Sequence, residues 1–133
     1  MICFDNNLLS DYLVGEPSAE EYLRQYEDEI WCVCSITLYE AMMGVFYGHI
    51  DGTTDSVIEA IEDFEKADVS DKTARHAVNI QEELQSHGHQ LEARDALIAG
   101  SAVEVGGALA TEDDGLVTAG EKGVLDVIEY ERP

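Results

Sequence analysis

Short apolar runs alternate with helix-like segments along the chain, and this alternation limits the fold more than any other feature. The runs at 1–4, 30–34 and 108–111 have the length of buried strands, and 124–130 alternates like an edge strand. Strands that alternate with helices are joined by right-handed crossovers into a parallel sheet. We therefore expect an α/β fold of three layers, in which helices cover both faces of a central parallel sheet of about four to five strands.

The segments between these runs have the periodicity of helices with one apolar face. A first helix stops at Gly15. The later segments that predict helices are 19–26, 35–47, 51–66, 71–87 and 93–105, and a short candidate strand lies at 67–69. Ser18, Ser35 and Asp71 are the expected N-caps, because their side-chain oxygens can accept hydrogen bonds from the first helical N–H groups.

The length and composition fit a single domain that spans residues 1–133. The chain has 133 residues, of which 45% are hydrophobic. The apolar part of its beginning is too short for a signal peptide, and no stretch approaches the roughly 18 apolar residues of a membrane span. We therefore expect a cytoplasmic protein with no membrane partner.

The chain is strongly acidic, with 29 acidic residues against seven basic ones and a net charge of −22. Such a charge repels nucleic acids and anionic membranes at ordinary ionic strength. The acids are interspersed with apolar positions and are not gathered into a tail, so they indicate a folded core with an acidic surface. In molar salt the Debye length is about 3 Å and this surface is screened. We therefore expect a halophilic protein.

The cysteines and histidines do not predict a metal or redox site. Cys3, Cys32 and Cys34 lie in apolar runs and lack the C-x-x-C spacing, which predicts buried, reduced thiols. The four histidines have no spacing typical of metal ligands, and we expect them at the surface.

Four acids stand near predicted junctions between strands and helices: Asp5, Glu40, Asp95 and Asp113. Asp113 belongs to an expected acidic turn at 112–115. Because the carboxyl ends of parallel strands meet at one edge of a sheet, we expect these four side chains to lie together. Two carboxylates 4 Å apart repel by about 1 kcal/mol in water and roughly 4 kcal/mol near a protein surface, so the cluster predicts a bound cation.

Ligands that are all carboxylate oxygens favour the hard ions Mg²⁺ or Mn²⁺, which commonly bridge protein carboxylates to phosphates. Such a site suits hydrolysis of a phosphodiester by a metal-activated water. The cation also provides a local positive charge that can attract a phosphate to an otherwise negative protein.

Four segments, in the same order along the chain, resemble the motifs of PIN domains. The opening D-T/S-N-h-h motif, the helix S-x-I-T-x-x-E-h-x-x-G, the D-x-x-I-A-x-x-A segment and the h-h-T-N-D turn resemble residues 4–13, 35–44, 94–102 and 109–113. The resemblance spans nearly the whole chain and implies a three-layer α/β/α PIN-like domain. The length and the D-A-L-I-A sequence are similar to the VapC toxins, which are Mg²⁺-dependent endoribonucleases held inactive by an antitoxin.

The resemblance implies roles for particular residues. The catalytic and metal-binding acids would be Asp5, Glu40, Asp95 and Asp113. Asn7, Thr111 and Asp114 would be hydrogen-bonding groups that orient these acids. Arg94 would contact either an RNA phosphate or a neighbouring carboxylate. The implied partners are an RNA substrate, such as tRNA or rRNA, a cognate antitoxin and a second copy in a homodimer.

The sequence departs from the PIN pattern at two positions that support the site. Asn6 replaces the usual Thr or Ser, and Glu112 replaces the usual Asn and adds an acid. Gly115 stands where many relatives carry an Asp that Asp114 could replace. Two alternatives to a toxin therefore stay open: a housekeeping PIN ribonuclease for RNA processing, or a degenerate PIN scaffold that binds RNA or protein without cleavage.

Two further sets of residues have open interpretations. Asp11, Glu112 and Asp114 are expected to be solvated surface acids. An apolar cluster on the early helices predicts either core packing or a surface for a dimer or an antitoxin helix; its residues are Tyr12, Tyr39, Met42, Met43, Phe46 and Tyr47.

Overall fold

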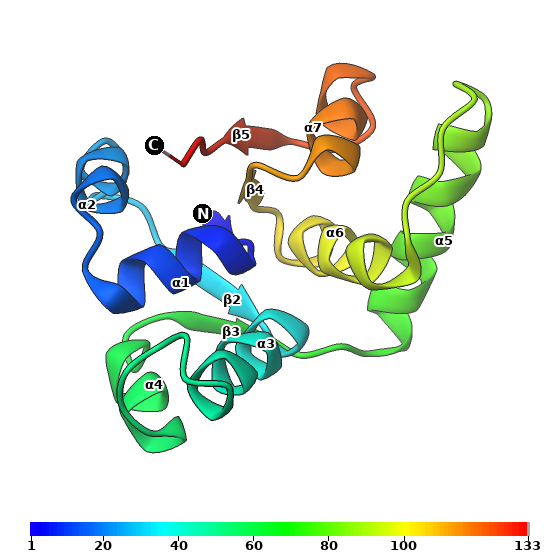
Figure 1. Cartoon of the computed structure of the whole chain (residues 1–133). Helices are drawn as coiled ribbons and strands as arrows, with labels where there is room; N and C mark the ends of the chain where they lie inside the picture. The colour runs from blue at the N-terminus through cyan, green and yellow to red at the C-terminus, as the bar shows by residue number, and fades with distance from the viewer. Residues whose placement is uncertain (133) are drawn as a thin grey trace.

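Five parallel strands form the central sheet, as the computed structural model shows for residues 1–132 (Figure 1). The strands are β1 (Ile2–Phe4), β2 (Trp31–Cys34), β3 (Glu65–Ala67), β4 (Ala108–Thr111) and β5 (Val127–Glu129). Their order across the sheet is β3-β2-β1-β4-β5, and every neighbouring pair is parallel. The predicted α/β fold, with its last strand at an edge, is confirmed.

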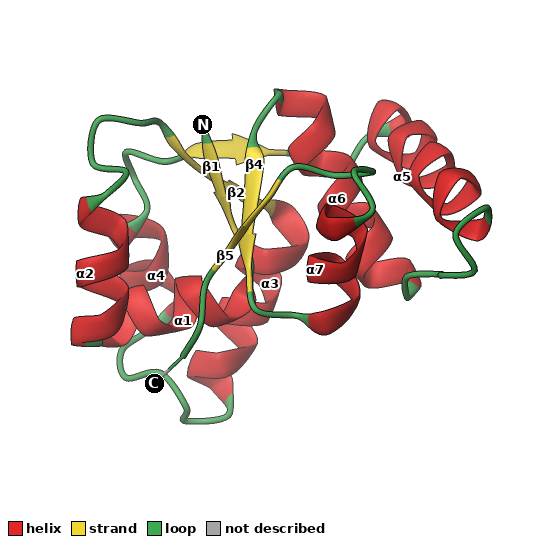
Figure 2. Cartoon of the chain, turned by 90° about the horizontal axis from the view of Figure 1, so that it is seen from above, coloured by secondary structure: helices red, strands yellow, loops and turns green. Residues whose placement is uncertain are grey.

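Seven helices cover the two faces of this sheet among the described residues (Figures 1 and 2). They are α1 (Asn6–Val14), α2 (Pro17–Arg24), α3 (Ser35–Phe46), α4 (Thr54–Ala60), α5 (Asp71–Gln85), α6 (Ala93–Val105) and α7 (Asp114–Glu121). Helices α1 to α4 contribute to the core on one face, and α5 to α7 contribute to the core on the other. None of these helices is long and apolar enough to cross a membrane.

The three inner strands, β2, β1 and β4, are buried on both faces because alternate residues point to opposite sides of the sheet. In β1, Ile2 and Phe4 pack with α1 to α4, whereas Cys3 packs with α5 to α7. In β4, Ala110 packs on the side of α1 to α4, and Leu109 packs on the side of α5 to α7. The cysteines are buried and free, as predicted. The apolar runs therefore read as nearly continuous because both sides of each strand face a core.

The predicted helix 51–66 and strand 67–69 are wrong in extent. Helix α4 ends at Ala60, and β3 begins at Glu65. The side chain of Lys66 stabilises the turn that follows the helix, since its Nζ donates hydrogen bonds to three carbonyls between α4 and β3, at 2.5, 3.0 and 2.7 Å: Ile61, Glu62 and Phe64. Residues 65–67 then pair with β2, so pairing with a neighbouring strand decides where β3 lies.

The three predicted N-caps lie one or two residues too late. Ser18, Ser35 and Asp71 are helical residues, and the actual caps are Glu16, Cys34 and Ser70. Helix α2 begins early because Pro17 has a backbone angle that suits the first helical position. Ser70 caps α5 through reciprocal hydrogen bonds with Thr73.

Helix α7 was not predicted, because its first residues were assigned to an acidic turn and two glycines interrupt its pattern. Asp113 caps this helix, since its Oδ1 accepts a hydrogen bond from the N–H of Leu116 at 3.1 Å. Gly120 allows the helix to lie against β5, because a Cβ at this position would lie 2.7 Å from the Cβ of Val127. Contact with the edge strand therefore stabilises a segment with weak helix propensity.

Candidate active site

Asp5 occupies a fixed position at the carboxyl end of β1, the central strand of the sheet. It is the N-cap of α1, and its Oδ1 accepts a hydrogen bond from the N–H of Asn6 at 2.8 Å. Its Oδ2 accepts a hydrogen bond from the hydroxyl of Thr111 at 2.6 Å. The side chain is buried, and these two bonds set its orientation.

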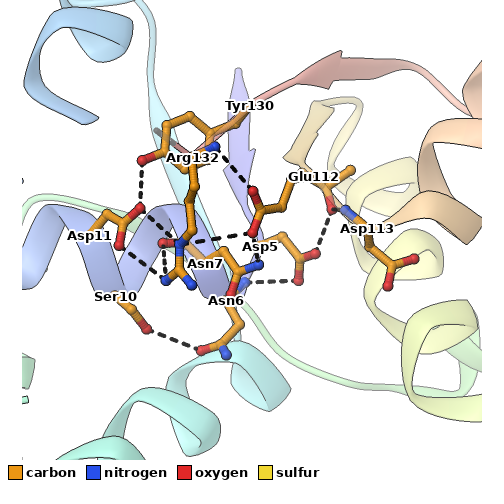
Figure 3. Close-up of polar contacts among 10 residues, drawn as sticks. Asp5, Asn6, Asn7, Ser10, Asp11, Glu112, Asp113, Tyr130 and Arg132 are labelled. Carbon is orange, nitrogen blue, oxygen red and sulfur yellow. Dashed lines mark hydrogen bonds and ion pairs between the residues drawn. The ribbon is translucent and has the colours of Figure 1, made fainter. Parts of the chain in front are cut away.

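Asp113 follows β4, the neighbouring strand. Its N–H donates to the hydroxyl oxygen of Thr111 at 3.0 Å, so Thr111 connects Asp113 to Asp5 (Figure 3). This contact agrees with the predicted role of Thr111 in orienting the site acids. One oxygen of Asp113 caps α7.

Asp95 lies in the first turn of α6 and is buried. Burial, together with the negative charges of Asp113 and Asp5, raises the pKa of Asp95 to about 6, although the positive charge of Arg94 lowers it. Asp95 therefore lies close enough to Asp113 and Asp5 for their charges to act on it.

Glu40, on α3, is held by Arg94. The Nε of Arg94 donates to one oxygen of Glu40 at 2.5 Å, and its Nη2 donates to the other at 2.9 Å. The Nη1 of the same guanidinium donates to Asp95 at 2.5 Å. Arg94 therefore binds carboxylates on two helices, which is one of the two contacts expected for it, and the hydrogen bonds to Glu40 raise its pKa.

A cavity of about 310 Å³ opens beside the aspartates, lined by Asp5, Asn6, Asn7, Arg94, Glu112, Asp113 and Asp114. Glu40 lines a neighbouring groove instead. In residues 1–132, no three acidic, histidine or cysteine side chains converge into a ready metal-coordination sphere. Asp5 and Asp113 thus line one cavity, and Asp95 lies near enough for their charges to act on it. Arg94 pairs with the fourth predicted acid, Glu40, and with one oxygen of Asp95.

The donor set fits a hydrated divalent cation. Mg²⁺ keeps several of its waters and needs only one or two direct carboxylates. The pKa of Asp95 is raised first by burial and then by the negative charge of Asp113, an effect that the positive charge of Arg94 does not cancel. A hard cation is the ligand that such oxygens favour.

Asp11 belongs to a buried polar cluster that the sequence did not reveal, and the expectation that it faces solvent is wrong. The hydroxyl of Tyr130 donates to its Oδ2 at 2.6 Å. Arg132 donates to the same carboxylate from Nε at 3.1 Å and from Nη2 at 3.0 Å (Figure 3). The buried contact raises the pKa of Tyr130 to about 12, with burial as the larger cause and Asp11 as the next. These partners lie 119 and 121 residues away, so no local pattern could indicate them.

Glu112 also contacts this cluster. The amide of Asn7 donates to one of its oxygens, and the N–H of Arg132 donates to the other at 3.1 Å. Figure 3 shows Glu112 pointing towards Asn7 and Arg132, while Asp113 points the other way. The hydrogen bond of Asn7 therefore goes to the added acid and not to an aspartate, and Glu112 is not the solvated residue that was expected.

A groove of about 500 Å³ lies between α1 and α3, next to the aspartate cavity. Tyr39 and Tyr47 line it, and both are exposed, as is Phe46 on the same helix. Tyr12, by contrast, packs in the core against Phe4, with ring centroids 6.0 Å apart. The apolar cluster of the early helices thus divides into core residues and exposed aromatic residues.

Solved structures of several bacterial proteins have the same fold. The match to a toxin–antitoxin complex from Klebsiella pneumoniae has a TM-score of 0.79 and 22% identity, and it covers 100% of this chain and 100% of that chain. For VapBC2 from Rickettsia felis, bound to a DNA fragment from its promoter, the TM-score is 0.74 at 20% identity, with 98% and 100% covered. For VapBC-5 from Mycobacterium tuberculosis, the TM-score is 0.64 at 22% identity, with 98% and 97% covered.

Sequence comparison identifies the family. No curated protein matches the chain significantly. The family model of the PIN domain matches residues 2–122, which include all the motif segments and the three aspartates. The chain therefore belongs to the PIN-domain family.

Proposed function

We propose that this protein is a divalent-metal-dependent endoribonuclease and the toxin of a type II toxin–antitoxin pair. The observation that carries the proposal is the meeting of three buried or partly buried aspartates, Asp5, Asp95 and Asp113, from separate segments of a PIN domain. The similarity to chains of toxin–antitoxin complexes supports the toxin assignment.

The three aspartates would hold Mg²⁺ or Mn²⁺, and Glu40 would complete the set of functional acids. When bound, such an ion supplies an activated water and offsets the charge that develops at phosphorus. Thr111 and the N–H of Asn6 keep Asp5 oriented, and the cap of α7 keeps one oxygen of Asp113 engaged. These contacts fix the carboxylates before a ligand arrives, which reduces the cost of binding it.

RNA is the substrate that we infer from the family. A surface with a net charge of −22 disfavours a long phosphate contact, so we expect binding to depend on the cation and on the few basic residues near it. Arg94 lines the aspartate cavity and Arg132 lines the neighbouring groove between α1 and α3; the two sites together are called the cleft below. The side chains of these arginines are 40% and 42% exposed. Each arginine already binds carboxylates, so it could bind a phosphate only if it gave up some of these hydrogen bonds or formed further ones beside them.

An antitoxin would bind in the groove between α1 and α3. The exposed Tyr39 and Tyr47 line this groove and offer apolar contacts to a partner. A second groove of about 380 Å³ between α5 and α6, lined by Val78 and Leu97, is the face that we assign to a homodimer.

The test is RNA cleavage in molar KCl with Mg²⁺ or Mn²⁺, comparing the wild type with Asp5→Asn and Asp95→Asn. We expect metal-dependent cleavage that falls at least about a hundredfold in both variants. Asp71→Asn, at an exposed helix start away from the site, is the matched control and should cleave like the wild type. Absence of cleavage by a folded wild type, or equal cleavage by Asp5→Asn, would contradict the proposal.

A PIN scaffold that binds without cleaving is the second candidate. It is favoured by the pairing of four acids near the cleft with two arginines, which leaves fewer carboxylates free. A folded wild type that binds RNA or a protein partner, but cleaves no RNA with either metal, would support it.

A further inference from the structure

We propose that Arg94 is the resident counter-ion of the cleft: it withholds Glu40 from the metal, so that the cation is held by the three aspartates and Glu40 acts as a positioning residue for Arg94. This inference rests on the proposed function, because it concerns the same cation. It assigns different roles to acids that the family resemblance treats alike.

The geometry of the pair leaves Glu40 with little capacity for a cation. Both of its oxygens accept hydrogen bonds from Arg94, at 2.5 and 2.9 Å. Two parallel bonds between a guanidinium and a carboxylate form a strong and directional pair. A cation that bound Glu40 directly would have to displace these bonds or lie beside a positive guanidinium, which would repel it.

The same guanidinium also reduces the capacity of Asp95 to bind a cation, but to a smaller extent. Its Nη1 donates to one oxygen of Asp95, at 2.5 Å, and leaves the other oxygen without this contact. The guanidinium thus binds Glu40 through Nε and Nη2 and Asp95 through Nη1. Arg94 therefore stands between Glu40 and the three aspartates.

The second arginine of the cleft provides a matched comparison. Arg132 also binds two acids, and its side chain is 42% exposed, against 40% for Arg94. Its partners are Asp11 and Glu112, which point away from Asp113 (Figure 3). Removal of either arginine deletes one positive charge and frees two acids, but only removal of Arg94 frees acids of the predicted catalytic set, Glu40 and Asp95.

The test is a double-mutant cycle on Mn²⁺ affinity, measured by calorimetry on metal-free protein in molar KCl without RNA. We expect Glu40→Gln to leave the Kd within about threefold of wild type and Arg94→Gln to tighten it by about tenfold or more. In the Arg94→Gln background, Glu40→Gln should reverse most of that gain, because the freed Glu40 has become a ligand. Arg132→Gln should stay within about threefold of wild type.

Other results would overturn the inference. Weakening of wild-type affinity by about tenfold on Glu40→Gln would show that Glu40 is already a ligand. A gain in Arg94→Gln that Glu40→Gln does not reverse, or an equal gain in Arg132→Gln, would show a general charge effect. Absence of any gain in Arg94→Gln, or absence of Mn²⁺ binding by the wild type, would also overturn it.

Each variant is checked by circular dichroism and thermal unfolding. If Arg94→Gln does not fold, Arg94→Lys takes its place: a lysine keeps the charge but cannot form the two-bond fork, so we expect a smaller gain in affinity, and no gain would contradict the inference. Binding in the expected pattern without RNA cleavage would retain this inference and remove the proposed nuclease. RNA cleavage by the wild type, accompanied by a strong loss of Mn²⁺ affinity in Glu40→Gln, would retain the proposed nuclease and overturn this inference.

Discussion

Arg94 and Arg132 bind acids on two sides of the same cleft, and the acids that they bind differ in kind. Arg94 connects α3 to α6 through Glu40 and Asp95, which belong to the predicted catalytic set. Arg132 connects the end of the chain to α1 and to the turn after β4 through Asp11 and Glu112, which do not.

The comparison shows how a very acidic chain can keep a defined cation site. Glu112, the added acid, lines the aspartate cavity, and both of its oxygens accept hydrogen bonds from Asn7 and Arg132, so its charge is partly offset locally. Arg94 binds both oxygens of Glu40 and one oxygen of Asp95, so it restrains one acid of the set fully and a second in part. The positions of two arginines, more than the number of acids, thus decide which carboxylates are available.

The largest expected effect is on RNA cleavage, and it separates two neighbouring residues: the site aspartate Asp113 and the arginine-bound acid Glu112. Asp113→Asn should lower metal-dependent RNA cleavage by about a hundredfold or more, while Glu112→Gln should change it by less than about fivefold. Asparagine caps a helix about as well as aspartate, so α7 should remain intact in Asp113→Asn. Equal losses of cleavage in the two variants would contradict the assignment of different roles to Glu112 and Asp113.

A smaller effect is expected on the stability of the Arg132 cluster. Asp11→Ala removes the buried carboxylate that binds Tyr130 and Arg132, and it should lower the free energy of unfolding by about 2 kcal/mol. Urea unfolding in molar KCl measures this change. A loss below about 0.5 kcal/mol would mean that the cluster is solvated in solution.

The smallest effect is expected from Arg132→Gln. The hydroxyl of Tyr130 keeps its bond to Asp11 in this variant, and the arginine is partly exposed, so the free energy of unfolding should fall by only about 1 kcal/mol or less. The same urea titration applies. A loss as large as that of Asp11→Ala would show that Arg132, and not the Tyr130 contact, holds the cluster together.

Local patterns in the sequence predicted the elements that local physics controls. Strands β1, β2 and β4 and helix α6 were predicted because apolar runs and helical spacing are visible within a few residues. Asp5 and Asp113 were placed correctly at one edge because the carboxyl ends of adjacent parallel strands must lie together.

The contacts that were missed depend on residues distant in the sequence. Glu40 lies in the second turn of α3, so the rule for strand ends does not fix its direction, and its bond to Arg94 spans 54 residues. The burial of Asp11 depends on Tyr130 and Arg132, at the other end of the chain. Helix α7 depends on packing against β5 more than on its own residues.

A crystal of the protein soaked in Mn²⁺, with the ion located by its anomalous scattering, tests the division between these acids most directly. We expect Mn²⁺ among Asp5, Asp95 and Asp113, with both oxygens of Glu40 still bound to Arg94. Mn²⁺ bound to Glu40 with Arg94 displaced, or a cleft that takes no Mn²⁺ at saturating concentration, would contradict this account.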